Sequence, residues 1–198
     1  LPTAGAAEAF TLLAHAFQPE QPLIVHPQFT QPEAAFIAAG HLPKRLVLSA
    51  STEFTLDSDQ VSAASDLVVI GNPTNPTGVL HPAAVITALR RPGRILVVDE
   101  AFMDCVPGEA ETMIGDEMTG LLVLRSLTKT WGLAGLRAGY VIGDPTLIAA
   151  TSVRPVTPAA APVPMLAMLM SLPSIVRLVS AVVLPIAPVI EMSAVPAS

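Results

Sequence analysis

Cysteine is nearly absent from this chain of 198 residues, in which Cys105 is the only one. A single thiol cannot form an intramolecular disulfide or a zinc site built from several thiolates, so we expect no metal centre of that kind. Charge is also scarce, because 13% of the residues are charged, against about 25% in an average soluble domain. The net charge of −6 argues against a nucleic-acid-binding protein, whose surface would be basic.

Glycine and aromatic residues are missing from one end of the chain. All 12 glycines and all of the Phe, Tyr and Trp residues lie at or before Gly143. We therefore expect a domain over residues 1–150 and an apolar, proline-rich tail over residues 151–198. The tail has an uncharged run at 155–176 that is about as long as a membrane span. Five prolines interrupt this run, so we predict an irregular extension and not a transmembrane helix.

We expect no targeting signal in the first residues of the chain. The sequence begins Leu1-Pro2-Thr3, with neither an initiator methionine nor a basic and apolar leader. We expect a cytoplasmic location, and we expect the chain to be part of a longer gene product.

Before residue 150 the sequence alternates between helical and strand patterns. Residues 67–70 and 95–98 are continuous apolar runs rich in β-branched residues, which are typical of strands buried on both faces of a sheet. The sequence therefore predicts an α/β fold of three layers, with a mostly parallel sheet and helices on both faces. The expected helices are 5–17, 30–39 and 81–90, and the expected strands are 22–26, 45–49, 67–71, 94–99, 121–125 and 140–142.

Polar residues follow three of these strands at their carboxyl ends, where open α/β sheets bind ligands. Asn75 lies in the turn after the first strand, Asp99 ends the second, and Ser126 and Lys129 follow the third. Taken singly, Asp99 is also typical of a turn cap and Lys129 of a solvated loop. Together they predict that a carboxylate, an amide, a hydroxyl and a lysine meet at one edge of the sheet.

The segment after the third strand has the composition of a phosphate site. Hydroxyls, a lysine and a guanidinium occur within it among three glycines, at Ser126, Thr128, Lys129 and Arg137. Neither a Walker A motif nor the Gly-x-Gly-x-x-Gly motif of dinucleotide-binding proteins is present. The sequence therefore predicts a phosphorylated ligand of another kind.

Three motifs occur in a characteristic order: NPTNPTG at 72–78, VVDEAF at 97–102 and SLTKTWGLAGLRAGY at 126–140. On these motifs the chain resembles the fold-type I, class I/II aminotransferases, which use pyridoxal 5'-phosphate (PLP). Within them it is similar to the group of histidinol-phosphate aminotransferases and cobalamin-branch threonine-phosphate decarboxylases. The resemblance covers residues 1 to about 150 and implies a large PLP-binding domain, here partial, of a protein that is a homodimer in the intact family.

The resemblance also implies how the PLP ring would be held. Lys129 would form the Schiff base, Asp99 would pair with the pyridine nitrogen, and Asn75 would bond to the ring O3'. The Asn75-Pro76 bond is expected to be cis, as it is in related enzymes. Phe29 would lie over the ring, although a plain core aromatic is an equally good interpretation.

The phosphate would be held at the start of the first helix. The resemblance implies that Ser126 and Arg137 bind it together with the backbone of Gly5, Ala6 and Ala7, where the helix dipole favours an anion. The freed Lys129 amine would then move a proton between the substrate and the cofactor, which gives transamination. Loss of the substrate carboxylate would give decarboxylation instead, and the sequence does not decide between the two.

Two departures from the family pattern affect the expected function. Phe102 stands where most members have a tyrosine that donates a second bond to O3', which favours the cobalamin-branch enzymes and a substrate such as threonine phosphate. Residues 151–198 show no resemblance to the family's small domain. We therefore predict a PLP-dependent aminotransferase acting on a small amino acid, phosphorylated or not. The alternatives are a threonine-phosphate-type decarboxylase, a PLP-binding fragment without catalysis, and a membrane-tethered or structural chain.

Overall fold

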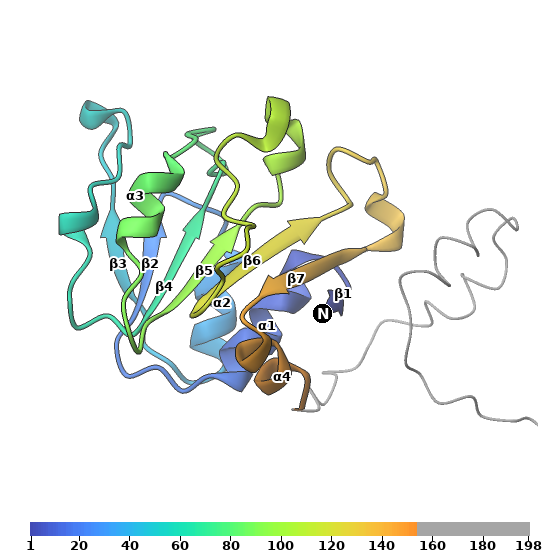
Figure 1. Cartoon of the computed structure of the whole chain (residues 1–198), viewed down its shortest axis with the longest axis horizontal. Coiled ribbons are helices and arrows are strands. Elements are labelled where there is room, and N and C mark those ends of the chain that lie inside the picture. The colour runs from blue at the N-terminus through green and yellow to red at the C-terminus, as the bar shows by residue number, and fades with distance from the viewer. Residues whose placement is uncertain (154–198) are drawn as a thin grey trace, which may run out of the picture. The chain divides into compact units, whose positions relative to one another are not determined.

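The protein is described by a computed structural model that places residues 1–153. Seven strands form one sheet in the order β1-β7-β6-β5-β4-β2-β3 (Figure 1). Neighbouring strands from β3 to β6 are parallel, whereas β7 is antiparallel to both β6 and β1. The strands are β1 (Pro2–Thr3), β2 (Pro22–His26), β3 (Lys44–Val47), β4 (Leu67–Gly71), β5 (Ile95–Asp99), β6 (Leu121–Ser126) and β7 (Gly139–Gly143). The predicted α/β class with a mostly parallel sheet is confirmed.

Helices cover both faces of this sheet. They are α1 (Ala6–Ala16), α2 (Gln31–Ala38), α3 (Ala83–Ala88) and α4 (Pro145–Val153). Residues of α1, α2 and α4 pack against alternate residues of the central strands, such as Val69 and Val97. Residues of α3 pack against the strand residues that point the other way, such as Val68 and Val98. The two clusters form separate cores on opposite faces, as the three-layer prediction requires.

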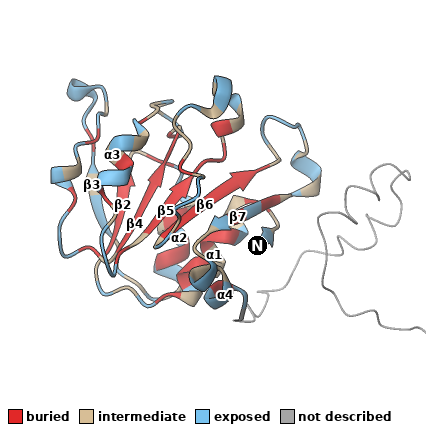
Figure 2. Cartoon of the chain, in the orientation of Figure 1, coloured by how far each residue is buried: buried red, intermediate tan, exposed pale blue. Residues whose placement is uncertain are grey.

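The centre of the sheet is buried throughout, whereas one edge is not (Figure 2). Every residue of β4 and β6 is buried, which explains why residues 67–70 and 121–124 are continuous apolar runs and not alternating ones. The edge strand β3 has three exposed residues among its four. Lys44 and Arg45 lie on this strand, and charged side chains at an edge discourage pairing with another chain.

Several element boundaries differ from the sequence-based expectations. The helix expected at 81–90 is limited to Ala83–Ala88, with Pro82 as its N-cap residue and not in its first turn. The two-residue strand β1 and the helix α4 were not expected, because neither has a clear hydrophobic period. Helix α4 runs past residue 150, where the domain was expected to end. The uncharged run at 155–176 lies outside the described residues, and no described helix is both long and apolar enough to cross a bilayer.

Gly139 brings the first helix close to the end of β6. A Cβ added at Gly139 would lie 2.8 Å from the carbonyl oxygen of Arg125 and 2.9 Å from the Cα of Gly5. Real Cβ atoms do not approach backbone this closely, so only glycine allows the contact. The result is that the N-terminus of α1 lies beside the carboxyl end of β6.

Candidate functional site

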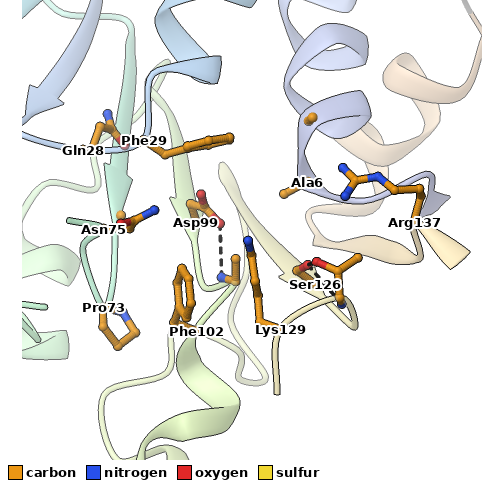
Figure 3. A pocket seen from close by; sticks show the side chains of 14 residues that line it. Ala6, Gln28, Phe29, Pro73, Asn75, Asp99, Phe102, Ser126, Lys129 and Arg137 are labelled. Atoms are coloured by element: carbon orange, nitrogen blue, oxygen red, sulfur yellow. Dashed lines mark hydrogen bonds between the residues drawn. The ribbon is translucent and has the colours of Figure 1, made fainter. Parts of the chain in front are cut away.

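A pocket lies at the carboxyl ends of β4, β5 and β6 (Figure 3). It is lined by Ala6, Ala7, Gln28, Phe29, Gly71, Pro73, Asn75, Asp99, Ala101, Phe102, Ser126, Thr128, Lys129 and Arg137. Every residue that the sequence predicted for cofactor binding is in this lining except Gly5. Gly5 lies just outside it, since a Cβ at that position would be 3.6 Å from the Arg137 guanidinium. The structure therefore brings the predicted residues together in one place.

Asp99 is a buried carboxyl in the wall of the pocket. It is the last residue of β5 and is 8% exposed, and its Oδ1 accepts a hydrogen bond from the backbone N–H of Ala101 at 3.1 Å. Burial raises the pKa of the Asp99 carboxyl to about 6, although the Ala101 bond and the charge of Lys129 act in the opposite direction. A cation close to Asp99 would therefore stabilise the ionised form of this buried carboxyl.

Lys129 enters the pocket from the loop between β6 and β7. Its Nζ lies 5.4 Å from the centroid of the Phe102 ring, and Figure 3 shows the side chain pointing toward Asp99. The backbone N–H of Gly132 donates to the Lys129 carbonyl at 3.0 Å and closes a turn. Lys129 Nζ makes no hydrogen bond within residues 1–153. The amine is therefore held near the carboxylate mainly by the path of its loop.

The turn that carries Asn75 is fixed by a buried amide. Asn72 is fully buried, and its Oδ1 accepts from the His81 backbone N–H at 2.7 Å while its Nδ2 donates to the His81 carbonyl at 3.1 Å. Nδ2 also lies 3.3 Å from the carbonyl of Glu111. The peptide bonds before Pro73 and Pro76 are both cis, the second as expected. Asn75 itself is exposed and lies at the pocket.

The opposite side of the pocket has donors for an anion. The start of α1 has no side-chain cap, so the backbone N–H groups of Ala6 and Ala7 are available to a ligand. Ser126 Oγ and Thr128 Oγ1 lie 2.8 Å apart, which places two hydroxyls beside them. Arg137 is exposed and has a left-handed backbone conformation with φ of 51°. Figure 3 shows Arg137 next to Ala6, as an anion cradle requires.

Sequence reasoning missed Gln28, which lines the pocket next to Phe29. Gln28 is 6% exposed, its Nε2 donates weakly to the Val69 carbonyl at 3.4 Å, and its buried Oε1 has no partner in the described part of the chain. Its position just after β2 is the signal that could have found it, because the ends of parallel strands form the binding edge. Phe29 is 40% exposed and is therefore not a plain core aromatic.

A cluster of charges around the buried Arg125 was also missed. The Arg125 guanidinium donates to Asp104 at 2.7 Å and to Glu109 at 2.6 Å, and lies 3.0 Å from Glu100. Glu100 is fully buried and also accepts from the Met113 backbone N–H at 2.6 Å. Burial raises the pKa of the Glu100 carboxyl, while Met113 and Arg125 oppose the shift. The sequence signal was a charged pair placed directly beside Asp99 and Ser126.

The fold and the site together define an α/β domain with a small-molecule site at the carboxyl edge of its sheet. Comparison with known proteins identifies the family. The model of the aminotransferase class I and II family matches residues 1–172, so the chain belongs to that family, as the three motifs predicted. The matched range runs past residue 150, where the resemblance was expected to end.

Similar proteins carry the two names expected from the motifs. A histidinol-phosphate aminotransferase of Mycobacterium tuberculosis is 53% identical over 154 residues, which cover 78% of this chain and 42% of that protein. A threonine-phosphate decarboxylase of Pseudomonas aeruginosa is 36% identical over 154 residues, or 76% of this chain and 44% of that protein. The chain thus spans less than half the length of these relatives.

Solved structures show the same fold. An aspartate aminotransferase of Thermotoga maritima superimposes with a TM-score of 0.68 at 21% identity, over 76% of this chain and 44% of that one. An L-threonine-O-3-phosphate decarboxylase of Porphyromonas gingivalis gives a TM-score of 0.63 at 25% identity, over 76% of this chain and 46% of that one.

Proposed function

We propose that this chain is the PLP-binding part of an aminotransferase that acts on a small amino acid through Lys129. The observation that carries the proposal is the arrangement of three groups around one pocket. Lys129 faces the buried Asp99, and the uncapped start of α1 lies on the far side. A basic ring nitrogen matches Asp99, an aldehyde matches Lys129, and a phosphate matches the start of α1. A ligand that carries all three groups therefore fits the pocket.

The pocket residues fit PLP at both ends. Asp99 is buried with a single hydrogen bond, so a protonated pyridine nitrogen would supply the cation that it lacks. The free N–H groups of Ala6 and Ala7, the Ser126 hydroxyl and Arg137 together fit a phosphate dianion. The unpartnered Oε1 of Gln28 is a further acceptor at the pocket wall. A phosphate and a ring cation therefore satisfy groups that the chain leaves open.

When bound, PLP supplies an electron sink for the bond that breaks at the substrate α-carbon. The chain's own residues would do the remaining work. Lys129 Nζ would take and return a proton at that carbon, and Asp99 would keep the ring nitrogen protonated. Asn75 would orient the ring through its amide. Phe29, half exposed at the pocket, would cover the ring and exclude water from one side.

The substrate class is proposed from the two kinds of relative. One is named for histidinol phosphate and the other for threonine phosphate, and both substrates are small phosphorylated amines. Phe102 at the pocket favours the second kind, so a threonine-phosphate-type decarboxylase is the alternative function. Because the chain spans less than half of these relatives, a PLP-binding fragment without turnover is a second alternative. We further propose a cytoplasmic homodimer for the intact protein.

The test uses the fact that the chain has two lysines, Lys44 and Lys129. The protein is incubated with PLP, reduced with borohydride, digested and analysed by mass spectrometry. We expect the phosphopyridoxyl mass on Lys129 and not on Lys44, which is exposed on the edge strand β3 and serves as an internal control. Equal labelling of the two lysines would refute the proposal.

Three assays then separate the candidate reactions. Amino transfer from glutamate would support the aminotransferase, whereas release of carbon dioxide from threonine phosphate would support the decarboxylase. Attachment of PLP at Lys129 without either reaction would support the fragment. The Lys129→Arg variant keeps the positive charge but should lose attachment and turnover together.

A further inference from the structure

The loop that carries Lys129 is in contact with one short turn along three consecutive residues. This turn, Phe102 and the 3₁₀ helix Met103–Cys105, follows β5. The Phe102 ring lies 5.4 Å from Lys129 Nζ, Cys105 Sγ lies 3.1 Å from Thr130 Oγ1, and Asp104 Oδ2 accepts from Trp131 Nε1 at 2.7 Å. The turn and the loop are therefore joined at three points.

Of these three contacts, only the one between Asp104 and Trp131 connects the loop to a buried charge. The Oδ1 of Asp104 accepts from Arg125 at 2.7 Å, while its Oδ2 accepts from Trp131. Arg125 is 4% exposed and is held from other sides by Glu100 and Glu109. Asp104 thus joins a fixed cation in the interior to a side chain that is 63% exposed. A bond to a charged acceptor is stronger than one between neutral groups.

Within the described residues, Asp104 is the only hydrogen-bond partner of the Trp131 side chain, and the Lys129 side chain has none. The lysine Nζ makes no hydrogen bond in the described part of the chain, so its position follows from the loop backbone two residues before Trp131. The loop is closed at its base by the Leu127 N–H, which donates to the Ala138 carbonyl at 3.0 Å. Between these points, two polar contacts join the loop to the turn, and the one from Trp131 to Asp104 is the shorter and has a charged acceptor, whereas the one between Thr130 and Cys105 joins neutral groups.

We propose that Asp104 is a positioning residue for Lys129, which it holds over Phe102 and toward Asp99 by anchoring Trp131. This inference rests on the proposed function of Lys129 only where PLP is concerned. The anchor itself is a property of the chain without any ligand. The two parts are therefore tested by separate measurements.

The first measurement needs no PLP. Trp131 is the only tryptophan of the chain, so its fluorescence reports on this loop alone. In Asp104→Ala we expect emission at longer wavelength and stronger quenching by acrylamide than in the wild type. Asp116→Ala is the matched control, because it removes the same charge from a carboxylate that makes no hydrogen bond or ion pair within residues 1–153. Identical quenching in Asp104→Ala and the wild type, at temperatures well below melting, would overturn the anchor.

The second measurement is a double-mutant cycle on PLP attachment, followed by borohydride trapping at Lys129. Asp104→Ala and Trp131→Phe are each expected to weaken attachment about ten-fold, which corresponds to about 1.4 kcal/mol. The double variant should be no weaker than Asp104→Ala, because Trp131→Phe removes only the contact that Asp104→Ala already removes together with the Arg125 bond. Trp131→Phe alters an exposed side chain and should keep the fold.

The outcomes separate the two proposals. Additive effects in the cycle would mean that Asp104 does not act through Trp131, and the positioning role would be wrong. Asp104→Asn, which keeps an acceptor for Trp131 but loses the charge, should fall between Asp104→Ala and the wild type. Failure of wild-type Lys129 to attach PLP would instead refute the proposed function, and the anchor would stand or fall on the fluorescence alone.

Discussion

The floor and the rim of the pocket differ in how they are held. By the floor we mean four residues at or next to the carboxyl ends of β4, β5 and β6, namely Asn72, Asp99, Glu100 and Arg125, of which only Asp99 lines the pocket. These residues are at most 8% exposed. Except for Asp99, each floor side chain has several hydrogen bonds or ion pairs to the chain itself. The rim, which we define as Phe29, Asn75, Lys129 and Arg137, is exposed. Floor residues should therefore determine stability without ligand, and rim residues should determine ligand binding.

The largest effect is expected from the floor, in Arg125→Met. This change leaves the fully buried Glu100 without its cation, and breaking a buried pair in this way costs about 3–5 kcal/mol. Chemical denaturation of the ligand-free chain measures the loss. The control is Arg90→Met, whose partner Glu117 has 73% of its side chain exposed and whose loss should cost less than about 1 kcal/mol. Similar losses in the two variants would show that burial of the Arg125 cluster does not increase its contribution to stability.

Asp99→Asn should stabilise the ligand-free chain, whereas Arg125→Met destabilises it. The reason is that Asp99 is the floor residue whose carboxylate makes no ion pair with the chain. The pKa of Asp99 in the folded state is about 6, above the 3.8 of a freely solvated carboxyl. Its ionisation therefore opposes folding, and the wild type should lose up to about 3 kcal/mol as the pH rises from below 4 to above 6.

The asparagine variant cannot ionise and should lack this part of the pH dependence. At pH 7 without ligand it should be the more stable protein, while the difference should vanish near pH 3. Denaturation curves of both proteins at a series of pH values measure the difference directly. With PLP the order should reverse, because the ring nitrogen then has no anion to pair with. Parallel pH profiles for the two proteins would show that Asp99 is not destabilised by burial.

All four rim residues were predicted from the sequence, whereas of the floor only Asp99 was, and the buried pair of Glu100 and Arg125 was missed. Asp99 and Ser126 end apolar runs, and the carboxyl ends of parallel strands must meet at one edge, so local pattern and topology agree. Lys129 was found from its motif. Its position over the Phe102 ring, however, depends on the contact between Asp104 and Trp131, which are 27 residues apart in the sequence. No periodicity reports such a contact.

Other features escaped the sequence for related reasons. The two residues of β1 pair with β7 across most of the described chain, and so short a strand has no pattern of its own. Gln28 is polar and follows a strand, yet its burial depends on packing against another segment, since a Cβ at Gly71 would lie 3.8 Å from its Oε1. The sequence thus predicts which segments meet, whereas packing between segments decides which side chains are enclosed.

On the rim, Arg137→Gln should weaken PLP binding about ten-fold, because it removes a charged hydrogen bond to the phosphate. Pyridoxal without its phosphate is the matched ligand, and its affinity should not change. Stability without ligand should also stay the same, since Arg137 is exposed and both residues occupy the same left-handed backbone conformation. Equal weakening for both ligands would place Arg137 away from the phosphate.

Phe102→Tyr is expected to have the smallest effect, and it tests the boundary between floor and rim. Phe102 is half-buried, and its ring lies 5.4 Å from Lys129 Nζ, a contact that a tyrosine ring preserves. The added hydroxyl would supply the second bond to the ring O3' that most family members have. We expect PLP to bind tighter by less than about 1 kcal/mol, as for one exposed hydrogen bond, with an unchanged melting temperature of the ligand-free chain. Titration with PLP measures the gain, and weaker binding in Phe102→Tyr would show that O3' lies away from this position.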